Sequence, residues 1–347
     1  MTQTIDAPVA TLSPQERVDA WLADFEAALA ARDAGRVVGK FTTDSFWRDL
    51  VAFTWNIKTV EGRDGIADML TSRLAETDPS GFRTRETPTE EFSGDQIITS
   101  AFIEFETAVG RGIGHLRLRD DEAWTLLTTL QEIMGFEERK GPTRVLGAVH
   151  GSDRDTRSWA EKRLDEERNL GYTEQPYIVI VGGGQGGIAL GARLRQLGVP
   201  AIVIDRHERP GDQWRKRYKS LCLHDPVWYD HLPYLPFPQN WPVFAPKDKI
   251  GDWLEFYTRA MEVPYWRSTT CLSASFDEAE KRWTVELDRN GERVTLRPAQ
   301  LVLATGMSDR PFQDALDSAQ FPPAAVQRRV AGGDRAALGV ALAVAGA

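Results

Sequence analysis

The stretch "YIVIVGGGQGGIALGARLRQLG", Tyr177–Gly198, constrains the fold more than any other part of this sequence. A run of strand-forming residues passes directly into a glycine-rich turn and then into a segment rich in alanine and leucine, which favour helix. Gly182, Gly184 and Gly187 give the spacing G-x-G-x-x-G at this junction. In such a unit the first glycine makes the tight turn, the second lets a pyrophosphate approach, and the third lets the helix pack against the strand. The stretch therefore predicts a dinucleotide site, with the phosphates at the helix N-terminus.

An acidic residue follows where this kind of fold needs one. Asp205 ends the next apolar run, "AIVID", about twenty residues after the first glycine, where an acid hydrogen-bonds a ribose hydroxyl. The glycine spacing alone is a weak signal. With a strand, a helix and an acid around it, a glycine turn that binds no ligand becomes the less favoured alternative.

This stretch begins past the middle of a chain of 347 residues, so a separate domain can precede it. From Gln15 on, Val18, Trp21, Leu22 and Phe25 follow helical spacing. Strand-like runs come next, separated by "SGD", "GRG" and "DDE", which are turn signals of an antiparallel meander. We therefore expect an α+β cone over residues 15–138.

The remaining boundaries follow from composition. Residues 139–175 are charged, and "TRSWAEKRLDEERNLG" predicts a connector helix that Gly171 ends. An α/β Rossmann-type domain is expected over 176–317, with a helix near 249–262, a hairpin at "DRNGE" and a last buried strand in "QLVLATG". We expect disorder over residues 1–14 and a low-complexity tail over 318–347.

The composition excludes several classes of function. A net charge of −9 without a block of Lys and Arg argues against nucleic-acid binding. The start of the chain has no secretory signal, so we expect a cytoplasmic protein, and the apolar run "ALGVALAVAGA" is too short to span a membrane. The two cysteines, Cys222 and Cys271, are far apart and are expected to be reduced and buried, and no metal site is expected.

The first domain, with the "EGRDGI" step between a strand and a helix, resembles the SnoaL-like fold of the nuclear-transport-factor superfamily. The resemblance implies an isomerase, cyclase or dehydratase built on a buried Asp and His. Asp49 and His115 are the nearest candidates. The alternative is a domain that binds a ligand or forms a homodimer, because function belongs to sites rather than to folds.

In the second domain, "GDQW" at Gly211–Trp214 and "ATG" at Ala304–Gly306 accompany the glycine turn. With "YKSLCLHDPVWYDHLPYLPFP", these motifs resemble the flavin-containing monooxygenases, and most of all their YUCCA-like and bacterial FAD-NAD(P)-dependent members. The resemblance implies that His224 neighbours the flavin, although a structural loop histidine is the alternative. The FAD-binding residues it implies are Gly182, Gly184, Gly187, Asp205, Arg206, Gln213, Trp214, His224, Ala304, Thr305 and Gly306.

The chemistry implied by this family needs FAD, NADPH and O2. NADPH reduces FAD, oxygen adds to give a flavin hydroperoxide, and a dry pocket protects it until a small soft nucleophile is oxygenated at nitrogen or sulfur. Members carry a second G-x-G-x-x-G for NADPH and an F-x-G-x-x-x-H signature, and we find neither. The residues after Gly306 are too few for another such unit, so we expect an incomplete two-dinucleotide-domain flavoprotein, truncated or frameshifted, that NADPH reduces poorly.

Two alternatives of other classes remain open. In the first, a non-catalytic cone binds a ligand or forms a homodimer and carries a vestigial FAD half-domain. In the second, the cone is itself an isomerase or dehydratase. A yellow chromophore would separate the monooxygenase from both alternatives.

Overall fold

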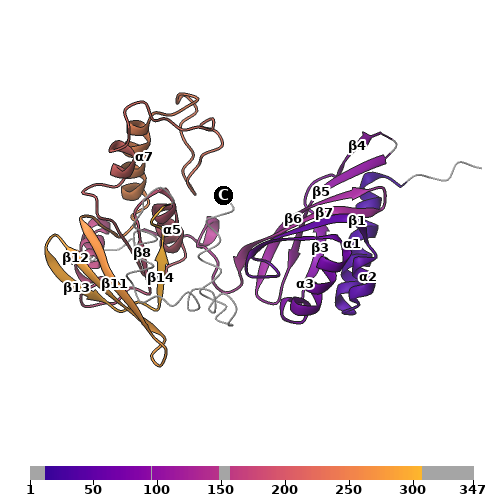
Figure 1. Cartoon of the computed structure of the whole chain (residues 1–347), viewed down its shortest axis with the longest axis horizontal. Helices are drawn as coiled ribbons and strands as arrows, with labels where there is room; N and C mark the ends of the chain where they lie inside the picture. The colour runs from indigo at the N-terminus through magenta and orange to yellow at the C-terminus, as the bar shows by residue number, and fades with distance from the viewer. Residues whose placement is uncertain (1–11, 95, 148–156, 307–347) are drawn as a thin grey trace, which may run out of the picture. The chain divides into compact units, whose positions relative to one another are not determined.

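The computed structural model describes residues 12–94, 96–147 and 157–306 of a chain that forms two compact units, Met1–Glu137 and Glu138–Ala347 (Figure 1). The expected tail over 318–347 and most of the expected N-terminal disorder lie outside the described residues. The expectation of disorder over residues 1–14 is wrong for Ser13 and Pro14, which form the start of the first helix. Ser13 caps the first helix, because its hydroxyl accepts from the Glu16 amide and the Glu16 carboxylate accepts from the Ser13 amide.

Three helices of the first unit, α1 (Pro14–Ala30), α2 (Ala34–Val38) and α3 (Gly62–Thr77), lie on one side of its sheet (Figure 1). The apolar stripe predicted for the first helix is confirmed, since Val18, Trp21, Leu22 and Phe25 are all buried on α1. The Phe25 ring packs at 5.9 Å from that of Trp47 in the sheet. This aromatic contact joins the helical layer to the sheet.

The sheet of the first unit has the order β2-β1-β7-β6-β5-β3, with β4 paired to β5. Its strands are β1 (Phe41–Leu50), β2 (Ile57–Glu61), β3 (Ser80–Thr84), β4 (Thr89–Ser93), β5 (Gln96–Glu106), β6 (Gly110–Arg119) and β7 (Glu122–Ile133). The predicted antiparallel meander is confirmed for β5, β6 and β7. A fully antiparallel sheet is wrong, because β1 pairs parallel with β7. Along one edge, β1 pairs antiparallel with β2 in a hairpin. Along its other edge it pairs with β7, the last strand of the meander, which runs in the same direction as β1.

The second unit contains a parallel sheet of order β10-β9-β8-β14, which confirms the predicted Rossmann-type α/β fold. The strands are β8 (Ile178–Val181), β9 (Ala201–Ile204), β10 (Tyr265–Trp266) and β14 (Gln300–Leu303). Helices α5 (Gln185–Gln196) and α7 (Lys247–Ala260) pack on one face through a common buried cluster. A meander of β11 (Thr269–Asp277), β12 (Arg282–Arg289) and β13 (Glu292–Leu296) packs on the other face.

Two predicted turns of the second unit are confirmed. Strands β12 and β13 form a hairpin at "DRNGE", where Asn290 and Gly291 both have positive φ, as a type I′ turn requires. Gly171 has φ +89° just after helix α4 (Trp159–Asn169), and a Cβ there would lie 2.4 Å from the Trp266 ring. Both left-handed backbone and close packing therefore favour glycine at 171.

Helix α4 belongs to the second unit rather than to a free connector. Glu262 accepts a hydrogen bond of 2.6 Å from the Trp159 indole and forms an ion pair of 3.4 Å with Arg163. Glu166, on the same helix, pairs with Arg195 of α5. These contacts explain why α4 groups with the second unit.

Three expectations from composition meet the structure here. Cys222 and Cys271 are free as expected, but both are partly exposed, so the prediction that they are buried is wrong. Among the described residues, no helix is long and apolar enough to cross a bilayer. No cluster of three or more His, Cys, Asp or Glu side chains suited to a metal occurs in this part of the chain.

Candidate dinucleotide-binding site

The three glycines of the turn between β8 and α5 differ in what surrounds them. A Cβ on Gly182, whose φ is +110°, would lie 2.3 Å from the Ala304 carbonyl oxygen, and one on Gly187 would lie 1.9 Å from the Gly182 carbonyl oxygen. Only the Gln213 Nε2 atom comes near Gly184, at 3.6 Å from its Cβ position. The packing reasons predicted for the first and third glycines are confirmed, and Gly184 is the one that leaves space above its backbone.

Helix α5 begins at this open glycine. Gly184 is its N-cap, and no side chain caps the first turn. The first N–H groups of an α-helix have no partner within the helix and carry the positive end of its dipole. The turn thus presents donors and a favourable potential for an anion at Gly184.

Gly183, which the G-x-G-x-x-G pattern leaves as a variable position, is held on both sides of its peptide. Its N–H donates to Asp205 Oδ2 at 2.7 Å, and its carbonyl accepts from the Tyr265 hydroxyl at 3.3 Å. A Cβ on Gly183 would lie 2.1 Å from that hydroxyl oxygen. Sequence reasoning missed both Gly183 and Tyr265. The unbroken run of three glycines, Gly182–Gly184, was the only signal for this contact.

Tyr265 remains a donor at neutral pH. Burial raises the pKa of its hydroxyl, and the nearby charges of Asp205 and Asp212 raise it further. A protonated phenol can donate to the Gly183 carbonyl. The turn is therefore shaped in part by a residue that lies far along the chain from it.

Asp205, the predicted ribose-binding acid, lies at the end of β9 with a side chain only 10% exposed. Its Oδ1 atom accepts from the His207 backbone N–H at 2.8 Å and contacts the His207 ring Nδ1 at 2.8 Å. Its other oxygen holds Gly183. The contacts with Gly183 and His207 therefore fix the orientation of the Asp205 carboxylate. Sequence reasoning did not single out His207.

The "GDQW" motif forms the short helix α6 (Asp212–Arg215) against α7. Gly211 has φ +88°, and a Cβ there would lie 2.2 Å from the Gly251 carbonyl oxygen. Asp212 is buried, and its carboxylate lies 3.0 Å from Arg215 Nη1 and 3.3 Å from Arg209 Nη2. Burial alone would raise the pKa of Asp212, but the hydrogen bond from Arg215 and the surrounding cations hold it below its usual value.

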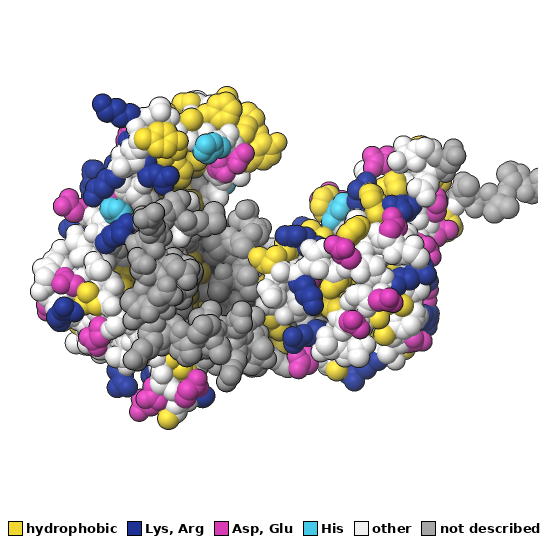
Figure 2. Space-filling view, viewed as in Figure 1, with side chains coloured by type: hydrophobic (Ala, Val, Ile, Leu, Met, Phe, Trp, Pro, Cys, Tyr) yellow, Lys and Arg dark blue, Asp and Glu magenta, His cyan; other side chains and the backbone are white. Residues whose placement is uncertain are grey.

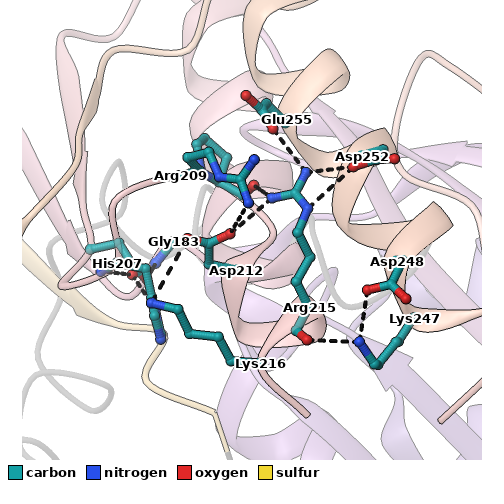
Figure 3. A network of polar contacts seen from close by, with 12 residues as sticks. Gly183, His207, Arg209, Asp212, Arg215, Lys216, Lys247, Asp248, Asp252 and Glu255 are labelled. Atoms are coloured by element: carbon teal, nitrogen blue, oxygen red, sulfur yellow. Dashed lines mark hydrogen bonds and ion pairs between the residues drawn. The ribbon is translucent and has the colours of Figure 1, made fainter. Parts of the chain in front are cut away.

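Arg215 links α6 to α7 through several acids (Figure 3). One of its terminal nitrogens lies 2.9 Å from Asp252 and 2.8 Å from Glu255, both on α7. The Lys247 ammonium donates to the Arg215 carbonyl at 2.7 Å and pairs with Asp248. Because these groups come from both helices, the network fixes the position of α6.

The two remaining residues of the motif lie close to the start of α5. The Trp214 indole donates to Gln185 Oε1 at 3.2 Å. Gln213 is the side chain nearest to Gly184. The structure therefore brings "GDQW" to the glycine turn.

The "ATG" segment also reaches the turn. The Ala304 N–H donates to the Val181 carbonyl at 2.8 Å, and the Thr305 nitrogen is 3.1 Å from the Cβ position of Gly182. Gly306, with φ +82°, is the last described residue. Of the other predicted residues, Arg206 is exposed just after β9, and His224 is exposed in the loop between α6 and α7. Among the described residues, no hydrogen bond or ion pair joins His224 to the turn, so its place beside a flavin stays a prediction.

Asp49 and His115 do not form a pair, so the catalytic arrangement expected in the first unit is wrong. Thr128 donates to Asp49 at 2.8 Å on the buried face of the sheet. His115 is paired in register with Leu127, the neighbour of Thr128, and successive residues of a strand point to opposite faces. His115 therefore lies on the outer face, where its ring packs 4.8 Å from that of Phe102.

Asp49 instead organises the loop after β1. The backbone N–H groups of Ala52, Phe53 and Thr54 donate to its carboxylate, and the Thr54 hydroxyl donates at 2.7 Å. In this loop Val51 has a positive φ, which is costly for a β-branched residue. Burial raises the pKa of Asp49, and the hydrogen bonds from Thr54 and its neighbours oppose that rise.

Comparison with known proteins finds relatives for part of the chain. The indole-3-pyruvate monooxygenase YUCCA1 of Oryza sativa subsp. japonica is 40% identical over 137 residues, which are 39% of this chain and 33% of the relative. A CzcO-like oxidoreductase of Geobacillus kaustophilus is 30% identical over 135 residues, or 39% of this chain and 37% of the relative. The chain thus spans about a third of the length of these relatives.

One solved structure also matches part of the chain. A flavin-containing monooxygenase from Stenotrophomonas maltophilia is 25% identical, with a TM-score of 0.34, and the match covers 38% of each chain. No protein-family model matches the chain.

Two adjacent glycines of α5 provide a test of the turn. We predict that Gly187→Ala lowers the free energy of unfolding of the second unit by about 1–3 kcal/mol, because the new methyl group meets the Gly182 carbonyl. Gly186 has nothing within 4 Å of its Cβ position, and Gly186→Ala should leave stability unchanged or raise it by up to about 1 kcal/mol. Denaturant unfolding measures both, and equal effects of the two substitutions would refute the assigned packing.

A second substitution tests the role of Asp49. Asp49→Ala leaves several buried hydrogen-bond donors without an acceptor, and each unpaired donor costs about 1–3 kcal/mol. We therefore expect the free energy of unfolding of the first unit to fall by at least about 3 kcal/mol. Asp44→Ala is the control on the same strand, since Asp44 is exposed and pairs with Arg119 at the surface, and it should change stability little. Similar urea midpoints for Asp49→Ala and the parent chain would show that the loop does not depend on this carboxylate.

Proposed function

We propose, from the premise that this chain is related to flavin-containing monooxygenases, that its second unit binds FAD as part of an NADPH-using, FAD-dependent monooxygenase. The observation that carries the proposal is the open side of Gly184 at the uncapped start of α5, with Asp205 oriented beside the same turn. Relatives and geometry thus point to the same ligand class.

The residues of the turn fit the adenosine diphosphate part of FAD. The first N–H groups of α5 would hold the diphosphate, because they are donors at the positive end of a helix. Asp205 would accept from a ribose hydroxyl, since its carboxylate is anchored and still partly exposed. Bound FAD would supply electron transfer from NADPH and activation of O2.

The loop between α6 and α7 is the part of the second unit that could exclude water from the flavin. It exposes hydrophobic side chains, and Figure 2 shows hydrophobic side chains gathered on the surface beside α7. Trp228, Tyr229, Val243 and Phe244 are between 46% and 74% exposed. An apolar wall of this kind suits a small soft nucleophile that is oxygenated at nitrogen or sulfur. We place His224 at this side of the flavin.

The step that uses NADPH is separate from FAD binding. The sequence contains one G-x-G-x-x-G, and the present proposal assigns it to FAD. Because the relatives are about three times as long as the matched part, NADPH use by this chain is proposed from their class alone. Poor reduction by NADPH stays a prediction.

For the first unit we propose a homodimer formed through the outer face of its sheet. Phe46 and Phe102 are 40% and 50% exposed on this face, which none of α1, α2 and α3 covers. Large aromatic side chains left in solvent on a sheet favour contact with another apolar surface. With Asp49 and His115 on opposite faces, dimer formation is better supported than isomerase or dehydratase chemistry.

A titration with FAD tests the main proposal. We expect the purified chain to bind FAD with a change in flavin fluorescence, and Asp205→Asn to weaken binding about tenfold through loss of a charge-assisted hydrogen bond. Glu286→Gln is the control, because in the described part of the chain the Glu286 carboxylate accepts hydrogen bonds only from the Thr295 hydroxyl. Absence of any fluorescence change at every FAD concentration would contradict FAD binding.

Light scattering after size-exclusion chromatography tests the dimer. The parent chain should have the mass of two chains, and Phe102→Glu should give a monomer, because a charge would be buried at the interface. Phe92→Glu is the control, since Phe92 is already 76% exposed on β4 at the edge of the sheet. A parent chain that elutes as a monomer would rule out the proposed dimer.

A further inference from the structure

The imidazole ring of His207 lies against the carboxylate of Asp205, and both side chains are largely buried. The ring Nδ1 atom is 2.8 Å from Asp205 Oδ1, and the side chains of His207 and Asp205 are only 17% and 10% exposed. Because the oxygens of a carboxylate can only accept hydrogen bonds, the ring nitrogen that faces Oδ1 carries the hydrogen and donates it. A side chain two positions after the acid therefore supports it directly.

The backbone fixes the place of this ring. The Asp205 N–H donates to the Trp266 carbonyl at 3.0 Å, and the Asp205 carbonyl accepts from the Thr269 N–H at 2.8 Å. The His207 carbonyl accepts from the Ser268 N–H at 2.8 Å. These hydrogen bonds tie both residues to the segment that runs from the end of β10 to the start of β11. The ring is therefore held in place before any ligand binds.

The donors around Asp205 are divided unequally between its two oxygens. Oδ1 accepts from both the backbone N–H and the ring of His207, whereas Oδ2 accepts from the Gly183 N–H at 2.7 Å. A carboxylate offers about four acceptor positions, two on each oxygen. Within the described part of the chain, Oδ1 is thus fully used and Oδ2 keeps one position for a further donor. That position lies beside the glycine turn, because Gly183 belongs to the turn.

We propose that His207 is a positioning residue for nucleotide binding, which occupies Oδ1 of Asp205 and thereby aims the remaining lone pair of Oδ2 at a ribose hydroxyl. This inference rests on the proposed function, because it takes the adenosine part of FAD as the occupant beside Asp205. His207 acts through the carboxylate rather than on the nucleotide. Its contribution to affinity should therefore depend on the ribose hydroxyls and vanish without them.

Two ligands, each titrated into the parent chain and into His207→Leu, test this dependence. We expect His207→Leu to raise the dissociation constant for ADP about fivefold, because a hydrogen bond that orients the acid is lost. The same variant should bind the dideoxy analogue of ADP, which lacks both ribose hydroxyls, as the parent chain does. Isothermal titration calorimetry measures all of these constants.

His207→Asn and His207→Gln form a matched pair. The Asn side-chain nitrogen stands as many bonds from Cα as the ring Nδ1, so His207→Asn should keep the dissociation constant for ADP within about twofold of the parent value. The Gln nitrogen lies one bond further out, where the ring Nε2 was, and His207→Gln should behave like His207→Leu. A purely steric role of the ring would give the opposite order, since Gln is closer to His in size.

The outcomes separate this inference from the proposed function. A parent chain that binds neither FAD nor ADP would overturn both. A parent chain that binds ADP, with a His207→Leu variant of equal affinity, would overturn only the inference. So would an equal loss of affinity for ADP and for its dideoxy analogue, which is the result expected of a histidine that only supports the fold.

The remaining outcomes also decide the inference. Equal binding of ADP and its dideoxy analogue by the parent chain would remove the ribose contact, and the role of His207 with it. If His207→Leu does not fold, the order of His207→Asn and His207→Gln decides. Tighter ADP binding by the Asn variant supports the positioning role, and equal or reversed affinities contradict it.

Discussion

The close approach of helix α5 to the end of β8 is the constraint on which the second unit depends. Only a hydrogen atom fits between Gly187 and the Gly182 carbonyl, and Gly182 in turn lies against the Ala304 carbonyl of the neighbouring chain segment. These contacts place the start of α5 at the carboxyl edge of the parallel sheet, where ligands of such folds bind. Asp205 and Tyr265 then hold the Gly183 peptide between them. The open side of Gly184 follows from this packing.

Sequence patterns predicted much of this arrangement because the interactions that shape it join residues close together in the chain. The strand, the turn and the helix are adjacent in the chain, and each glycine has a steric reason that spacing alone conveys. Asp205 was found because the length of a βαβ unit sets its distance from the turn. Gly183 and Tyr265 were missed because their contacts join segments that are distant in the chain. His207 was missed although it lies only two residues after Asp205. The prediction that Cys222 and Cys271 are buried was wrong because composition does not show which face of a segment is covered.

The first unit shows the opposite case. The register of β6 with β7 places His115 on the face opposite Asp49, which the residue types alone did not show. The parallel pairing of β1 with β7 could not be predicted from periodicity, because an alternating pattern is the same in both directions. A buried acid here has a structural explanation, since backbone donors of the following loop surround it. The chemistry proposed for this chain therefore belongs to the second unit.

A crystal structure of the chain grown with ADP would test the central claim most directly. The account predicts electron density for a diphosphate at the N-terminus of α5, beside Gly184, with the ribose hydroxyls at Asp205. A nucleotide bound elsewhere on the chain, or a glycine turn that stays free of ligand at saturating ADP, would contradict the claim that this turn is a dinucleotide site.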